Sequence, residues 1–351
     1  MFFFKAKYSK FIFVIRYLNR FTTKKNLILV FFLLIFSSIT EFITLFAITG
    51  FLGILTLEPN EFYQVPILKF FENNLNIQNL SISEISILLA LIIIISSFVR
   101  IITFSKSNYL AAQIGNRASK NFLYSFLSQK FDSYLSCSES QIVNISTNYA
   151  NSLVLLINRF LALISGLVSS VLIVLGIFFV DIKIALFLIF ALPFTYYLLT
   201  YRSRRKITFN GKLIAQKTAQ HILIVKDVFG SFRDIILSGS IKDYVNDYFK
   251  VDKEIRYSRA NSMTLTSLPR YIIEPLFILM LTFYIVINSD NNGSLYLVLG
   301  TLVFAALKLL PSFQQIFSSY SGIKTDYPSA LILINASIEM DKNKRNIIFN
   351  N

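Results

Sequence analysis

Six apolar segments dominate this sequence, and each is long enough to cross a bilayer core, which takes about 20 helical residues. They lie at 27–57, 82–104, 153–180, 184–201, 267–288 and 295–317. Only 15% of the residues are charged, whereas a soluble domain carries about 25%. The sequence therefore predicts an all-α membrane protein with six transmembrane helices.

The chain contains a single Cys and a single His, and this argues against a disulfide-rich protein and against a His/Cys metalloprotein. One Cys and one His cannot form a disulfide scaffold, and they argue against a His/Cys metal site. The net charge of +15 would suit a nucleic-acid-binding protein. However, the basic residues follow the apolar segments rather than one polar face. We expect no metal, no cofactor and no nucleic acid to bind this chain.

The distribution of Lys and Arg predicts the orientation in the membrane. One set of connections and tails carries 28 of these residues, the other set carries two, and four more lie inside the spans. Cytoplasmic segments are the ones enriched in Lys and Arg. Both termini are therefore expected in the cytoplasm, with the membrane itself as the first partner of the chain.

Two cytoplasmic connections, 105–144 and 200–266, are long and contain no proline. Connections of this length usually contain Pro and Gly, so these are predicted to be helices that continue the spans, at 111–131, 212–228 and 244–262. The alternative is two small soluble inserts. We divide the chain into an amphipathic N-terminal helix (1–26), a six-span domain (27–320) and a cytoplasmic C-terminal tail (321–351).

A second amphipathic segment lies in the outer connection between the first two spans, at 66–77. It alternates apolar and polar residues as a helix at a membrane surface does. Its predicted lipid-facing residues are Ile67, Phe70 and Phe71.

The arrangement of spans and long cytoplasmic helices resembles the transmembrane domain of an ABC exporter, over the whole chain. Three stretches narrow the resemblance to one group within the ABC exporters. They are 229–249, LPRYIIE at 268–274 and ALKLLPS at 306–312. They look like the bacterial lipid-linked-oligosaccharide flippases and their polysaccharide-export relatives. The resemblance implies a homodimer, or a half-transporter with a partner, in the bacterial inner membrane. Such a protein moves an amphipathic or lipid-linked substrate outward by alternating access.

The same resemblance implies that the tips of the two cytoplasmic connections dock onto ATPase domains through short transverse helices. These would lie at 136–143 and 227–233. The residues implied in coupling to the ATPase are Ser136, Glu139, Asp227, Phe229, Gly230, Phe232 and Arg233.

The sequence contains no phosphate-binding motif of the form G-x-x-x-x-G-K-[ST], whose backbone amides and lysine hold nucleotide phosphates. Gly211-Lys212 is followed by Leu213, and the stretch 237–240 only begins like the ABC signature. We therefore expect no enzymatic activity from this chain alone. ATP and Mg²⁺ would bind to an ATPase domain that is a separate polypeptide or was lost by truncation.

Charge inside a membrane span is costly and usually functional, and five of the charged residues within the predicted spans stand out as candidates. They are Glu41, Arg100, Arg270, Glu274 and Lys308. One interpretation is a cationic cavity for an anionic headgroup, in which the two acids orient the three cations. By resemblance, the three cations match basic positions of the flippase cavity. The alternatives are cations that reach the interface along their own side chains, and a structural pairing of Glu41 with Arg270 or Lys308.

Two other functions remain open from the residues. One is a membrane glycosyltransferase or phosphotransferase, which needs clustered carboxylates or His at the membrane face. The other is an ion-coupled flippase, which usually contains internal repeats and broken spans. Neither pattern is evident in the sequence.

Overall fold

The computed structural model describes residues 21–56, 81–129, 138–178, 182–287 and 292–348. These residues are almost entirely helical, and they contain no strand. The helices are α2 (Lys24–Thr56), α4 (Ile82–Leu127), α6 (Glu139–Asn144), the π-helical turn η3 (Ile145–Tyr149), α7 (Ala150–Phe178), α8 (Ile182–Gly230), α9 (Phe232–Ser238), α10 (Ile241–Ile287) and α11 (Asn292–Ile348). The predicted all-α class is confirmed for this part of the chain.

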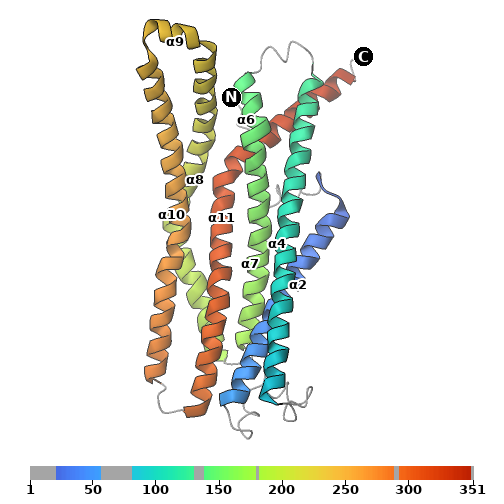
Figure 1. The fold of residues 1–351 in the computed structure, drawn as a ribbon, viewed down its shortest axis with the longest axis vertical. Coiled ribbons are helices and arrows are strands. Elements are labelled where there is room, and N and C mark those ends of the chain that lie inside the picture. The colour runs from blue at the N-terminus through green and yellow to red at the C-terminus, as the bar shows by residue number, and fades with distance from the viewer. Residues whose placement is uncertain (1–20, 57–80, 130–137, 179–181, 288–291, 349–351) are drawn as a thin grey trace.

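The helices form one elongated bundle (Figure 1). Helices α2, α4, α7 and α11 pack against one another, and α8 and α10 form a long hairpin beside α11. The short helix α9 joins α8 to α10 at one end of the bundle, and α10 ends and α11 begins at the other end.

Three helical runs are long and apolar enough to cross a membrane: Lys24–Leu55, Ile82–Leu127 and Glu139–Phe178. They contain the first three predicted spans, apart from terminal residues outside the described ranges. The other three predicted spans fall on α8, α10 and α11. Their helical character is confirmed, whereas the count of six membrane crossings stays a prediction.

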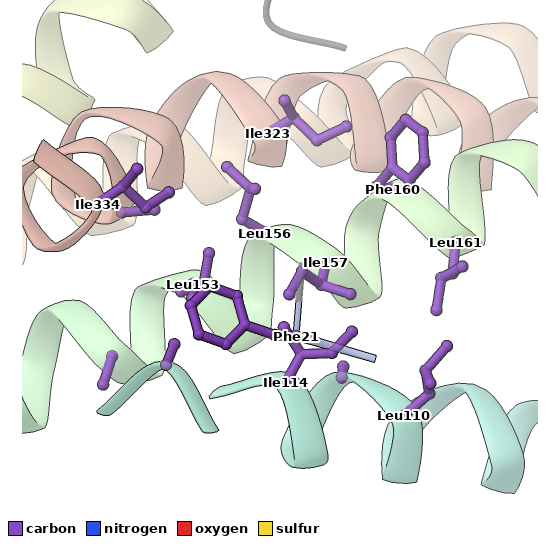
Figure 2. Close-up of a cluster of buried hydrophobic side chains, with 14 of the residues drawn as sticks. Phe21, Leu110, Ile114, Leu153, Leu156, Ile157, Phe160, Leu161, Ile323 and Ile334 are labelled. Carbon is purple, nitrogen blue, oxygen red and sulfur yellow. The ribbon is translucent and has the colours of Figure 1, made fainter. Parts of the chain in front are cut away.

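Helix α7 supplies the centre of the core. Its residues Leu153, Leu156, Ile157, Phe160 and Leu161 recur at the spacing that places side chains on one broad helix face. In Figure 2, Leu156 and Phe160 lie toward α11, where Ile323 is labelled, and Leu161 lies toward Leu110 of α4. All of these side chains are buried. The core thus joins α4, α7 and α11.

The predicted extensions of the spans are continuous helices rather than soluble inserts. Helix α4 continues to Leu127, α8 to Gly230, and α10 begins at Ile241. Polar contacts hold α8 against α10 along the hairpin. Lys217 Nζ lies 2.9 Å from Glu254 Oε2, and Asn210 donates to Ser262 Oγ at 3.1 Å.

The segment 321–351, predicted as a cytoplasmic C-terminal tail, continues helix α11 in its described part, 321–348. Helix α11 passes through residue 320 without a break, and Ile323, Ala330, Leu333 and Ile334 are buried in the core. The reason is that the apolar residues after 320 continue at helical spacing, so this segment covers α7 instead of leaving the bundle. Helix α11 contains Pro311 and Pro328 and changes direction toward its C-terminal end (Figure 1).

The two predicted transverse helices also differ in their bounds. The described part of 136–143 begins a helical run that continues through η3 into α7, because no Gly or Pro interrupts it. Residues 227–230 end α8, and the separate short helix, α9, begins later, at Phe232. Ser136, most of the amphipathic segment 1–26, and the outer segment 66–77 with Ile67, Phe70 and Phe71 lie outside the described residues.

Candidate functional site

Four of the five predicted intramembrane charges form two ion pairs. Glu41 of α2 pairs with Arg100 of α4, with Arg100 Nη1 3.4 Å from Glu41 Oε1. The Glu41 side chain is only 10% exposed, whereas that of Arg100 is 58% exposed. Arg100 therefore neutralises the buried carboxylate of Glu41, while much of its guanidinium stays accessible. The expected alternative partners of Glu41, Arg270 and Lys308, are not the ones it contacts.

The second ion pair lies within α10. Arg270 Nε lies 3.5 Å from Glu274 Oε2, so the pairing expected from their spacing of four residues is confirmed. Both side chains are exposed. Lys308 of α11 is half-buried, and its carbonyl accepts a hydrogen bond from Ser312. Among the described residues, no ion pair links Lys308 or the α10 pair to Glu41 and Arg100.

The tip of the α8–α10 hairpin carries an apolar surface, which we call the tip surface, formed by Phe229, Phe232, Ile236 and Leu237. All four side chains are exposed, Phe229 to 80% and Leu237 to 74%. Ile235 is the buried residue of α9. The other residues predicted to couple this tip, Asp227, Gly230 and Arg233, are also exposed.

The stretch 237–240, which begins like an ABC signature, ends helix α9. Gly239 has a left-handed backbone (φ 67°), which a residue without Cβ adopts at low cost. The Ser240 N–H donates to the Ile235 carbonyl, and the Gly239 N–H donates to the Ile236 carbonyl, as in a Schellman motif. This glycine is therefore required by the turn into α10.

The first predicted coupling segment contacts the hairpin. Lys226 Nζ of α8 lies 2.8 Å from Glu139 Oε2 of α6, and the two helices pack together. Both side chains are largely exposed. The ion pair connects the start of the α6–α7 run to the hairpin near α9, so the two predicted coupling segments lie on the same part of the bundle.

An ion pair between a half-buried guanidinium and a mostly buried carboxylate, which sequence reasoning missed, joins α7 to α11. Arg159 Nε lies 2.9 Å from Asp326 Oδ2, and the Asp326 side chain is 13% exposed. Arg159 passes Gly322 so closely that a Cβ there would lie 1.3 Å from Nη1. The sequence contains an indication of this site, because Lys324 and Asp326 interrupt a stretch otherwise made of apolar, small and hydroxyl residues.

Within the described residues, no group of three or more His, Cys, Asp or Glu is placed to hold a metal ion. No protein-family model matches the sequence. Any functional argument for this chain therefore starts from its own geometry, above all from the tip surface and the intramembrane charges.

Proposed function

We propose that this chain is the membrane half of an ATP-driven exporter or flippase that moves a lipid-linked or amphipathic substrate outward. ATP hydrolysis would come from an ATPase domain, either on a longer form of this polypeptide or on a separate subunit. Two copies of the membrane half would line one translocation path. In this proposal the tip surface receives the motion of the ATPase domain, and the hairpin transmits it to the spans.

The tip surface is the observation that carries this proposal. Helix α8 continues from the predicted end of its span at Tyr201 to Gly230, which at 1.5 Å per residue is about 40 Å. Lipid cannot cover apolar side chains at that distance. Exposed apolar patches of this kind mark sites where proteins associate. A partner that docks here would bury Phe229 and Phe232.

The charges inside the predicted spans suit an anionic substrate headgroup. Arg100 is paired with Glu41 but remains largely exposed, and Arg270 is exposed beside Glu274. Charge-assisted hydrogen bonds from such cations are about twice as strong as neutral ones. A phosphate or pyrophosphate on a lipid carrier is the substrate chemistry that these cations favour.

Reconstitution with the ATPase domain tests the proposal. In proteoliposomes, we expect ATP-dependent movement of a fluorescent lipid-linked oligosaccharide. Phe229→Ala or Phe232→Ala should reduce this movement about tenfold, as loss of an apolar interface residue worth about 1.4 kcal/mol does. Basal ATP hydrolysis should continue, because the nucleotide site lies on the partner.

Tyr257→Ala is the matched control, because Tyr257 is an exposed aromatic residue of α10 away from the tip. It should transport normally. Full transport by both Phe variants would place the docking site elsewhere. Transport without any ATPase would favour an ion-coupled flippase, and a chemically altered lipid product would favour a membrane transferase.

A further inference from the structure

A cluster of cations surrounds the side chain of Tyr320 where α8 and α11 meet. We call Arg204, Tyr320 and Lys324 the Tyr320 cluster. Arg204 Nη2 donates to the Tyr320 hydroxyl at 2.7 Å. Lys324 Nζ lies 4.0 Å from the centre of the Tyr320 ring, and Arg204 Cζ lies 6.0 Å from it. One phenol side chain therefore has two cations beside it.

Close packing of the two helices fixes this cluster. A Cβ at Gly211 of α8 would lie 2.7 Å from the carbonyl oxygen of Thr325 and 3.0 Å from that of Lys324. The α8 backbone thus contacts α11 with no side chain between them. Arg204 lies two turns before this contact on α8, so its position relative to Tyr320 is set by rigid helices.

The Tyr320 cluster lies at the predicted membrane surface. Arg204 comes three residues after the predicted span at 184–201, and Tyr320 comes three residues after the predicted span at 295–317. Three residues of helix correspond to about 4.5 Å. Both side chains therefore lie at headgroup depth, where tyrosine is enriched in membrane proteins.

The local charge is strongly positive. Helix α8 contains no Asp or Glu between Ile182 and Lys226, whereas Arg204, Arg205 and Lys206 follow one another and are exposed. Lys324 is buried, with 7% of its surface accessible. The nearby carboxylate of Asp326 is paired with Arg159. The surroundings of Arg204 and Tyr320 are therefore rich in basic side chains.

We propose that Arg204 and Tyr320 bind the phosphate of an anionic phospholipid from the adjacent leaflet. The Tyr320 oxygen accepts a hydrogen bond from Arg204, so its own proton is available to a phosphate oxygen. The guanidinium has further N–H groups for a second phosphate oxygen. Basic pockets between helices at this depth bind anionic headgroups in other membrane proteins.

The acidity of the phenol is consistent with this role. Burial raises the pKa of Tyr320, but hydrogen bonds and positive charge from Lys324 and Arg204 outweigh it and lower the pKa below its ordinary value. A more acidic hydroxyl is a stronger hydrogen-bond donor. The site is distinct from Arg100, Arg270 and Lys308, which lie inside the spans, and it does not depend on the transport proposal.

Lipid binding to the purified protein tests the site. The delipidated full chain in detergent is titrated with phosphatidylglycerol or phosphatidylcholine, and bound lipid is counted by native mass spectrometry. We expect phosphatidylglycerol to be preferred. Arg204→Gln should weaken its binding about tenfold, the loss expected for one charge-assisted hydrogen bond. Tyr320→Phe should weaken it several-fold, because it removes only the hydroxyl.

Arg205→Gln is the control, since it removes the same charge from the next exposed position of α8. It should bind phosphatidylglycerol nearly as the parent does. Equal losses in Arg205→Gln and Arg204→Gln would overturn the site in favour of diffuse attraction to the membrane. Equal affinity for the two lipids would also overturn it.

Thermal unfolding separates lipid binding from a structural role. If the Tyr320 cluster only holds α8 to α11, Tyr320→Phe will lower the melting temperature equally with and without phosphatidylglycerol, which contradicts the proposal. We expect instead that the stabilisation by this lipid shrinks in the variant. In the last measurement, inorganic phosphate replaces the lipid. If it stabilises the protein as much as the lipid does, the site binds a small anion and the lipid assignment is wrong.

Discussion

At the scale of single residues, Gly322 leaves the space through which Arg159 reaches Asp326. In Gly322→Ala the added Cβ would overlap the guanidinium, lying 1.3 Å from Nη1 and 2.2 Å from Cζ. Arg159 must then move away from the buried carboxylate. We expect unfolding to become easier by about 1–2 kcal/mol at pH 7, because Asp326 loses its partner and must take up a proton, which costs about 1.4 kcal/mol for each pH unit above a pKa of about 6. Thermal unfolding in detergent measures this loss.

Gly230→Ala is the matched control for that substitution. A Cβ at Gly230 has no heavy atom within 4 Å, and the residue ends helix α8. Alanine there should leave stability unchanged or raise it by up to about 1 kcal/mol, as alanine does in place of helical glycine. Equal destabilisation by both substitutions would mean that contact with Arg159 is not the cause.

The same ion pair predicts a pH dependence of stability. Burial raises the pKa of Asp326 from 3.8 to about 6, because the cost of removing the carboxylate from water exceeds the opposing effects of Arg159 and Arg259. Between about pH 4 and 6 the folded protein therefore holds a proton that the unfolded chain has lost. The contribution of Asp326 to the free energy of unfolding is highest below pH 4. It falls by about 3 kcal/mol as the pH rises to 6, and is constant above that.

Asp326→Asn isolates this contribution, because all other titrating groups cancel in the difference between the two proteins. Melting temperatures are compared from pH 4 to pH 8. The parent should lose stability relative to the variant up to pH 6, with no further relative change. A difference that is flat across pH 4–6 would show that Asp326 titrates as an ordinary exposed carboxylate.

At the scale of helices, the sequence predicted most of the fold and less of the site. Apolar segments, and connections without proline, identified the continuous helices α4, α8 and α10, because both features are local. The end of α9 at Gly239 could not be placed from resemblance alone, since it depends on a left-handed turn. The segment after residue 320 was assigned to a tail, because its partner, the buried face of α7, is distant in sequence.

The ion pairs also divide into those within one helix, which the sequence predicts, and those between two helices, which it does not. The Arg270–Glu274 pair lies on one helix, so its spacing of four residues was sufficient to predict it. The partners Arg100 and Glu41 lie on different helices, as do Arg159 and Asp326, or Arg204 and Tyr320. Their pairing depends on the relative rotation and height of two helices. No periodicity within one segment contains that information.

At the scale of the whole molecule, the fold and the distribution of charge together predict which end faces the cytoplasm. Helix α9 lies at one end of the bundle, and the end of α10 and the start of α11 lie at the other (Figure 1). The Lys and Arg bias of 28 to two predicts that the α9 end faces the cytoplasm. Because the chain has a single cysteine, Cys137→Ser gives a background in which new cysteines report their own accessibility.

In that background, Lys242→Cys at the start of α10 should react with a membrane-impermeant maleimide in inside-out vesicles only. Asn291→Cys, in the connection between the last two predicted spans, should react in right-side-out vesicles only. Leu279→Cys should stay unlabelled in both, because its exposed position lies within the fifth predicted span, where lipid covers it. Labelling of Lys242→Cys and Asn291→Cys from the same side would contradict the predicted arrangement. The fifth predicted span would then not cross the bilayer, and the proposed docking of a cytoplasmic ATPase on the tip surface would lose its support.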